Sequence, residues 1–302
     1  MISIGSVKIS GNFVLAPLSG VNCTAFRLLC KENGANLIYT QMIDVDIINQ
    51  KNYDELKEFL NIQPQENPVT IQIIGNNKKS LAEAVKKVEP FADIIDLNMG
   101  CIEIDYIAKK SGAYLLKDIK NSIDLFSSMV NATIKPVSAK IRIGWDAQTI
   151  NAVKLAQQLE EVGAAAVCIH GRTAQQKYSG KVNWTIMKQV KEKTKIPIIA
   201  NGNVDSIETG ETLLSKTNCD LVMIGRESMH RPWVFSNKTI DIKEQIFRFI
   251  ELYNTYERRQ SAQEVADHVF WMLRDYETLE NTKKIHLLRT ISQIKRFVSR
   301  LN

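Results

Sequence analysis

The chain of 302 residues lacks several features that would place it outside the ordinary globular enzymes. It has no run of about 18 apolar residues, so we expect no membrane-spanning helix. Its first 17 residues contain one lysine and no long apolar stretch before a small-residue cleavage site, so we predict no secretion signal and a cytoplasmic location. No G-x-G-x-x-G motif follows the first predicted strand, which disfavours a doubly wound dinucleotide-binding sheet.

The cysteines are few, odd in number and widely spaced. There are five, none of them in a C-x-x-C pair: Cys23, Cys30, Cys101, Cys168 and Cys219. This spacing suggests neither a zinc site nor a disulfide framework, so we predict no bound metal. Each cysteine is first interpreted as a small buried hydrophobe, unless its surroundings indicate a reactive thiol.

The charge is mildly positive, with 39 Lys and Arg against 33 Asp and Glu, for a formal net charge of +6. Hydrophobic residues make up 44% of the chain, enough for a sizeable core. Residues 281–302 contain no acid but several basic residues, namely Lys283, Lys284, Arg289, Lys295, Arg296 and Arg300. Two interpretations stay open at this point: a solvated helix face, or a surface that binds a polyanion.

Short apolar runs alternate with amphipathic stretches as far as residue 225. The runs start about 25 to 45 residues apart, which leaves room for one helix and two loops each time. They read as continuous rather than alternating apolar segments, as is typical of a parallel sheet covered by helices. Eight such units predict an α/β fold, a (β/α)8 TIM barrel, with strands at 13–17, 37–42, 69–74, 93–98, 137–143, 166–170, 197–201 and 221–225.

The strand signal stops after about residue 240. Three helical patterns follow, at 241–259, 262–280 and 282–301, with neither Gly nor Pro in them. We therefore predict a barrel domain over residues 1–240 and a small C-terminal helical domain over residues 241–302. If the last pattern is one helix, Lys284 and Lys295 share a face, and Arg296 lies roughly 100° round from them.

Polar residues stand where the predicted strands end. Because function in a (β/α)8 barrel sits at the carboxyl ends of the strands, these residues are expected to converge on one mouth. They are Asn98, Lys140, Arg142, His170 and Asn201.

Cys101 follows the fourth strand, in the segment Asn98-Met99-Gly100-Cys101. A thiol with a pKa of about 8.5 is protonated at neutral pH, so it can act as a general acid without activation. The alternative is a packed, inert cysteine. The last two strands end in Asn201-Gly202-Asn203 and Gly225-Arg226, and glycine-containing loops at these positions commonly bind phosphate in barrels of many activities.

Taken together, these segments resemble the tRNA-dihydrouridine synthase family over almost the whole chain. The most specific segments are N-M-G-C at 98–101 and H-G-R-T at 170–173. Others are A-P-L-S-G-V at 16–21, K-I-R-I-G-W at 140–145, N-G-N at 201–203 and I-G-R at 224–226. The alanine-proline start and the glycine-arginine end also occur in other flavin barrels.

The resemblance implies a bound FMN that is reduced by NADPH and reoxidised by a uracil base of tRNA. Cys101 would then protonate C5 of the uracil, and Lys140 would favour the reduced flavin. By the same matching, the expected FMN contacts are Pro17, Leu18, Ser19, Gln72, Lys140, His170, Asn201, Gly202, Asn203, Gly225 and Arg226.

For the substrate, the resemblance makes Asn98 and Arg172 candidates for holding the base. It also favours the phosphate-binding interpretation of the C-terminal basic run, with Lys284, Lys295 and Arg296 as expected contacts. Some positions depart from the family pattern. Ile102 stands where proline usually follows the cysteine, Leu18 replaces a common methionine, and Asn22-Cys23 replaces Thr-Asp. These departures indicate a distant branch, so the position of the target uridine is not transferred.

Two rival functions remain to be compared. An FMN barrel that acts on a free pyrimidine, such as a dihydroorotate dehydrogenase, would share the cofactor and a loop cysteine, but not the basic helical region or H-G-R-T. A non-catalytic RNA-binding module would not need Cys101, Lys140 and His170.

Overall fold

A computed structural model describes residues 1–278 and 282–301 of the chain. Its main sheet is a barrel of parallel strands, in the hydrogen-bonded order β3, β11, β10, β9, β8, β7, β6, β4. A parallel bridge between Val14 and Leu37 joins β3 to the segment that leads into β4, which closes the circle. The strands are β3 (Phe13–Leu15), β4 (Ile38–Tyr39), β6 (Val69–Ile74), β7 (Ile94–Met99), β8 (Val137–Arg142), β9 (Ala166–His170), β10 (Ile198–Asn201) and β11 (Leu221–Ile224). The predicted (β/α)8 barrel is confirmed.

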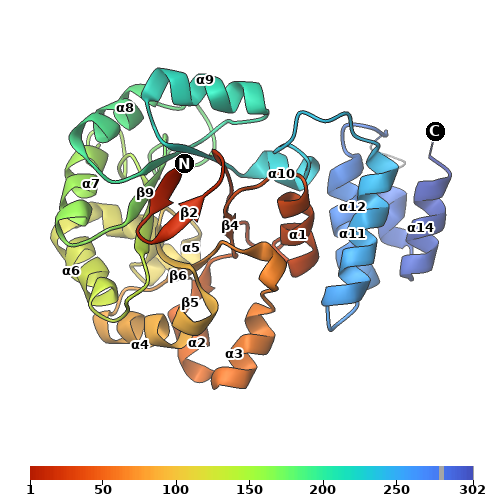
Figure 1. The fold of residues 1–302 in the computed structure, drawn as a ribbon, viewed down its shortest axis with the longest axis horizontal. Coiled ribbons are helices and arrows are strands. Elements are labelled where there is room, and N and C mark those ends of the chain that lie inside the picture. The colour runs from red at the N-terminus through yellow and green to blue at the C-terminus, as the bar shows by residue number, and fades with distance from the viewer. Residues whose placement is uncertain (279–281, 302) are drawn as a thin grey trace.

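Helices surround the barrel (Figure 1). Several begin at a side chain that accepts a hydrogen bond from the first turn, as Asn77 does for α4 and Asp118 for α6. The helices of this part are α1 (Thr24–Glu32), α2 (Val45–Gln50), α3 (Tyr53–Leu60), α4 (Lys78–Val88), α5 (Ile104–Ala108), α6 (Ile119–Val130), α7 (Ala152–Glu161), α8 (Trp184–Lys193), α9 (Ile207–Thr217) and α10 (Arg226–His230), with 3-10 turns η1 (Pro64–Glu66), η2 (Glu89–Phe91) and η3 (Gly112–Lys117).

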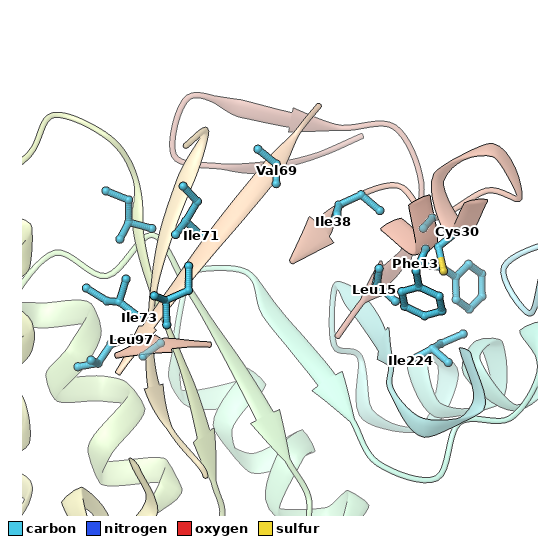
Figure 2. Packing of buried hydrophobic residues seen from close by; sticks show 14 of the residues in the cluster. Phe13, Leu15, Cys30, Ile38, Val69, Ile71, Ile73, Leu97 and Ile224 are labelled. Atoms are coloured by element: carbon cyan, nitrogen blue, oxygen red, sulfur yellow. The ribbon is translucent and has the colours of Figure 1, made fainter. Parts of the chain in front are cut away.

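The core lies between the strands and the helices. On β6, Val69, Ile71 and Ile73 belong to this outer layer, whereas Thr70 and Gln72 are buried polar residues of the same strand. Figure 2 shows those three side chains along β6, and Phe13, Leu15 and Cys30 grouped near Ile224. Both faces of the strands are buried, which explains why their sequences read as continuous apolar runs.

Two small elements were not expected from the sequence. Strands β1 (Ile2–Ile4) and β2 (Val7–Ile9) form an antiparallel hairpin. Ile4 and Ile9 are buried in a cluster inside the barrel, so the hairpin covers the end opposite the strands' carboxyl termini. A short strand, β5 (Ile43–Asp44), pairs with the end of β6.

The last part of the chain is helical and lies beside α1 (Figure 1). It contains α11 (Ile242–Tyr256), α12 (Ala262–Leu273), the 3-10 turn η4 (Lys284–Leu287) and α14 (Ile291–Ser299). Arg248 of α11 pairs with Glu32 of α1 at 2.6 Å. Within the described residues, no helix is long and apolar enough to span a membrane.

The expectation of one helix over 282–301 is wrong. Leu288 has extended backbone angles, and Thr290 begins a new helix by accepting a hydrogen bond from the Gln293 backbone N–H while Gln293 bonds back to it. This capping box ends any continuity with η4. Lys284 and Lys295 therefore do not share the face of one helix.

Candidate active site

A cavity of about 830 Å³ opens at the carboxyl ends of the barrel strands. Its size lies within the range of cofactor-binding pockets. The structure brings most of the predicted site residues together in its wall, namely Pro17, Leu18, Ser19, Asn98, Cys101, Lys140, His170, Asn201, Gly202, Asn203, Gly225 and Arg226.

Strand register places the polar ends of the strands side by side. Asn98 of β7 pairs with Lys140 of β8, and both Arg142 of β8 and Asn201 of β10 pair with His170 of β9. Lys140 Nζ donates to Asn201 Oδ1 at 3.3 Å. Burial lowers the pKa of the Lys140 ammonium. A bound anion beside the ammonium would stabilise the charged form against this effect. Lys140 therefore favours an anionic ligand in the cavity.

His170 forms a neutral part of the wall. Burial, helped by the charge of Lys140 and neighbouring arginines, lowers the pKa of its imidazole to about 2. Gly202 lies against this ring: a Cβ atom at Gly202 would be 3.1 Å from His170 Cδ2, and the Gly202 φ of +131° strains any other residue. The glycine therefore allows the loop after β10 to pack on the histidine.

Cys101 is half-buried and held in place by its backbone. Its N–H donates to Asn98 Oδ1 at 2.8 Å, and its carbonyl accepts from the Ala113 N–H at 2.8 Å. Gly112, with a φ of +61°, leaves room for that carbonyl, because a Cβ there would lie 2.7 Å from it. Burial raises the pKa of the Cys101 thiol, so the proton stays on Sγ at neutral pH. Ile102, in place of the expected proline, packs against the core.

A buried chain of hydrogen bonds supports this loop from below. Asn98 Nδ2 donates to Gln72 Oε1 at 2.7 Å, and Gln72 Nε2 donates to Asp96 Oδ2 at 2.8 Å. Ser138 donates to the other Asp96 oxygen at 2.6 Å. Gln72, a predicted FMN contact, is 0% exposed and lies outside the cavity lining. It therefore acts on the site through Asn98.

Arg172, a predicted contact of the base, also lies outside the cavity lining. Its Nε donates to the Ser179 carbonyl at 2.9 Å, and its Nη2 to the Gly180 carbonyl at 2.7 Å and Asn203 Oδ1 at 3.1 Å. With 2% exposure, this side chain shapes the loop after β9 instead of facing a ligand.

The predicted C-terminal RNA contacts are likewise separate from the cavity lining. Lys284 is exposed on η4, and Lys295 and Arg296 are exposed on α14. They remain candidates for a surface beyond the site.

Sequence reasoning missed several residues that line the cavity. Tyr178 lies with its ring 5.5 Å from the Arg142 guanidinium carbon and 5.2 Å from that of Arg226. The only signal for it was its position shortly after H-G-R-T. Arg274, just beyond α12, also reaches the rim, where its Nη1 lies 3.2 Å from His230 Nε2. Nothing in the pattern of the C-terminal helices indicated that contact.

The arrangement combines three chemical capacities. A protonated thiol at Cys101 faces the same cavity as the half-buried amine of Lys140. The loop 201–203 and Arg226, whose Nη2 bonds to Asn203 Oδ1 at 3.4 Å, together supply donors for a phosphate. The site can therefore hold a flat ligand with a phosphate tail and deliver one proton to a second molecule.

Comparison with known proteins is consistent with this chemistry. The family model described as dihydrouridine synthase matches residues 14–297. A protein named probable tRNA-dihydrouridine synthase from Rickettsia conorii is 34% identical over 92% of this chain and 81% of its own length. Two proteins named tRNA-dihydrouridine synthase B are also similar. The one from Pseudomonas aeruginosa is 34% identical over 78% of this chain and 71% of its own length. The one from Shewanella oneidensis is 30% identical over 97% and 95%.

Among solved structures, a morphinone reductase variant in complex with tetrahydroNAD is similar, with a TM-score of 0.58. The match covers 76% of this chain and 87% of that one, at 11% identity. At that identity, the likeness shows a shared fold.

Proposed function

This chain belongs to the dihydrouridine synthase family, and from that premise we propose that it is a flavin-dependent oxidoreductase that reduces the C5–C6 double bond of specific uridines in tRNA. The observation that carries the proposal is the position of Cys101, a protonated thiol held over the same cavity that contains Lys140. A tRNA substrate agrees with the names of the relatives.

FMN is the cofactor that the cavity residues fit best. Lys140 and Arg226 support this assignment, because they bring two cationic groups to one cavity, as the anionic ring edge and the phosphate of FMN require. Pro17, Leu18 and Ser19 would line the ring, and Lys140 would stand beside its anionic edge. Asn201, Gly202, Asn203 and Arg226 would hold the phosphate, with His170 next to them. When bound, FMN reduced by NADPH supplies the hydride for C6 of the uracil.

The protein's own contribution to the reaction is a proton. Cys101 Sγ holds it, because burial keeps the pKa of the thiol above its usual range, and releases it to C5 of the base as a general acid. Asn98 positions this thiol through the Gly100 and Cys101 N–H groups, at 3.0 and 2.8 Å. The base must leave its stack in the RNA to enter the cavity, because a stacked uracil could not reach Cys101 inside it.

RNA binding is assigned to the region 241–302, which we propose as a domain beside the barrel domain 1–240. Its exposed basic side chains, Lys284, Lys295 and Arg296, would contact phosphates. Arg172 would act on the substrate only indirectly, by holding the loop that carries Tyr178. A tRNA substrate is consistent with the cytoplasmic location that we propose.

The test is reconstitution with purified full-length protein, FMN and NADPH. We expect dihydrouridine in unmodified tRNA transcripts and no reduction of orotate or free uracil. Reduction of a free pyrimidine with no effect on tRNA would overturn the proposal in favour of a small-molecule enzyme.

A further inference from the structure

Three potential metal ligands meet outside the cavity of Cys101, between the start of α1 and α12. Cys23 precedes α1, and Glu264 and His268 lie four residues apart on α12, so both face the same way. One ligand atom from each lies within 4.8 Å of the other two. Since Cys23 and His268 are 245 residues apart, no spacing motif reveals this group.

The distances suit a tetrahedral zinc ion. With Zn–S of about 2.3 Å and Zn–N of about 2.0 to 2.1 Å, a tetrahedral angle separates sulfur from nitrogen by roughly 3.6 Å. Cys23 Sγ and His268 Nε2 are 3.5 Å apart. Thiolate, imidazole and carboxylate are all ligands that zinc accepts.

The surrounding charge favours a cation. A hollow of about 270 Å³ is lined by Cys23 and by the carboxylates Glu257 and Glu264. Arg27 lines it too, but its guanidinium is already paired with Glu66 at 2.5 Å. The hollow is also a path for the ion to enter and a place for water to complete its coordination.

Neighbouring side chains hold two of the ligands in position. The His268 ring lies 5.6 Å from the Phe26 ring and 4.6 Å from the Phe249 ring, measured between centroids. Tyr253 donates its hydroxyl proton to Glu264 Oε2 at 2.6 Å. Such outer contacts are typical of metal ligands whose orientation is fixed before the ion binds.

The geometry points to a zinc site formed by Cys23, Glu264 and His268, with water from the hollow as the fourth ligand. Binding breaks the S–H bond of Cys23, forms a sulfur–zinc bond and releases the proton to solvent. The ion then joins the start of α1 to α12, so it ties the barrel to the C-terminal helices. This site is separate from the cavity of Cys101, and its test needs neither flavin nor RNA.

The experiment is a Co²⁺ titration of the metal-free full-length protein under anaerobic conditions. We expect one Co²⁺ per chain, with a near-ultraviolet thiolate-to-cobalt charge-transfer band and the intense visible bands of a tetrahedral ion. Cys23→Ser, nearly the same size, removes the charge-transfer band. Glu264→Gln weakens Co²⁺ affinity by roughly tenfold or more. Cys219→Ser, a matched change at a buried cysteine outside this hollow, leaves the spectrum as in the wild type.

A second measurement uses the unaltered chain. Stoichiometric Zn²⁺ should slow alkylation of Cys23 by iodoacetamide, followed by peptide mass spectrometry, while alkylation of Cys101 keeps its rate. The proposal is overturned if no charge-transfer band forms, if the band survives Cys23→Ser, or if Zn²⁺ leaves the alkylation of Cys23 unchanged. In those cases the short contact is a thiol–imidazole hydrogen bond.

Discussion

Replacing Asn98 by Asp changes one group at the centre of the buried chain that supports Cys101. In the wild type, Asn98 donates to Gln72 at 2.7 Å, and Gln72 donates to Asp96 at 2.8 Å. The Asn98→Asp variant loses the first donor. If the Gln72 amide rotates by about 180° so that its NH₂ donates to the new carboxylate, the Gln72 oxygen then faces Asp96. One contact between two acceptors remains in either orientation.

The cost follows from burial. An unmade hydrogen bond at buried groups costs about 1 to 3 kcal/mol, so we expect the free energy of unfolding to fall by roughly 2 kcal/mol at about pH 8. A proton on Asp96 repairs the chain, because the protonated carboxyl donates to Gln72 Oε1. Burial already raises the pKa of Asp96 to about 6, and a second carboxylate nearby raises it further. The folded state then holds this proton more tightly than the unfolded state, so the deficit shrinks as pH falls through and below that pKa.

Urea unfolding of wild type and variant at about pH 8 and about pH 5 measures both effects. Asn77→Asp is the matched control: Asn77 accepts from the Ser80 N–H at 3.0 Å on an exposed helix start, where aspartate serves equally well. Two results would contradict this order of hydrogen bonds from Asn98 through Gln72 to Asp96. One is an Asn98→Asp variant as stable as the wild type at about pH 8, and the other is a loss of stability that grows as the pH falls.

Three further outcomes are expected. Cys101→Ala should lower uridine reduction on the order of 10²-fold or more while NADPH still reduces the flavin, since the thiol supplies only the proton; equal loss of both half-reactions, in stopped-flow absorbance, would make the thiol structural. Heat-denatured protein should release FMN by mass and absorbance, and release of FAD would contradict the assignment. Changing Lys284, Lys295 and Arg296 together to Glu should weaken tRNA binding and flatten its salt dependence, by roughly 0.7 to 0.9 in slope for each phosphate that the variant no longer neutralises. Lys79→Glu, at an exposed position of α4, is its control, and unchanged tRNA affinity in the triple variant would assign RNA binding to the barrel.

The barrel was predictable because its strands are buried on both faces. The run at 69–74, for example, is β6 residue for residue, and three of its four apolar positions, Val69, Ile71 and Ile73, pack under the helices. The hairpin β1–β2 escaped prediction because strands of three residues are too short to show a period. The break before α14 had a visible signal, Thr290 followed by Gln293, but the apolar spacing on both sides concealed it.

The sequence predicted which residues belong to the site, but not which of them line the cavity and which lie beneath it. Strand ends marked Asn98, Lys140 and His170, because strand ends meet at one mouth in any such barrel. Pattern alone did not show that Gln72 lies beneath the cavity while Tyr178 lines it, because that depends on which polar partner each side chain finds in three dimensions. The meeting of Cys23 with α12 depends on tertiary packing in the same way.

The contact between α1 and the C-terminal helices also sets an order of events during synthesis. Phe26 of α1 packs on His268, and the Ala25 N–H bonds to Glu257, so this face of α1 is covered by residues made much later. From the end of α1 at residue 32 to the start of α11 at residue 242 the ribosome adds 210 residues. At about 5 to 20 residues per second that takes roughly 10 to 40 s. For that interval, the face of α1 that will pack on the last helices stays uncovered on the nascent barrel.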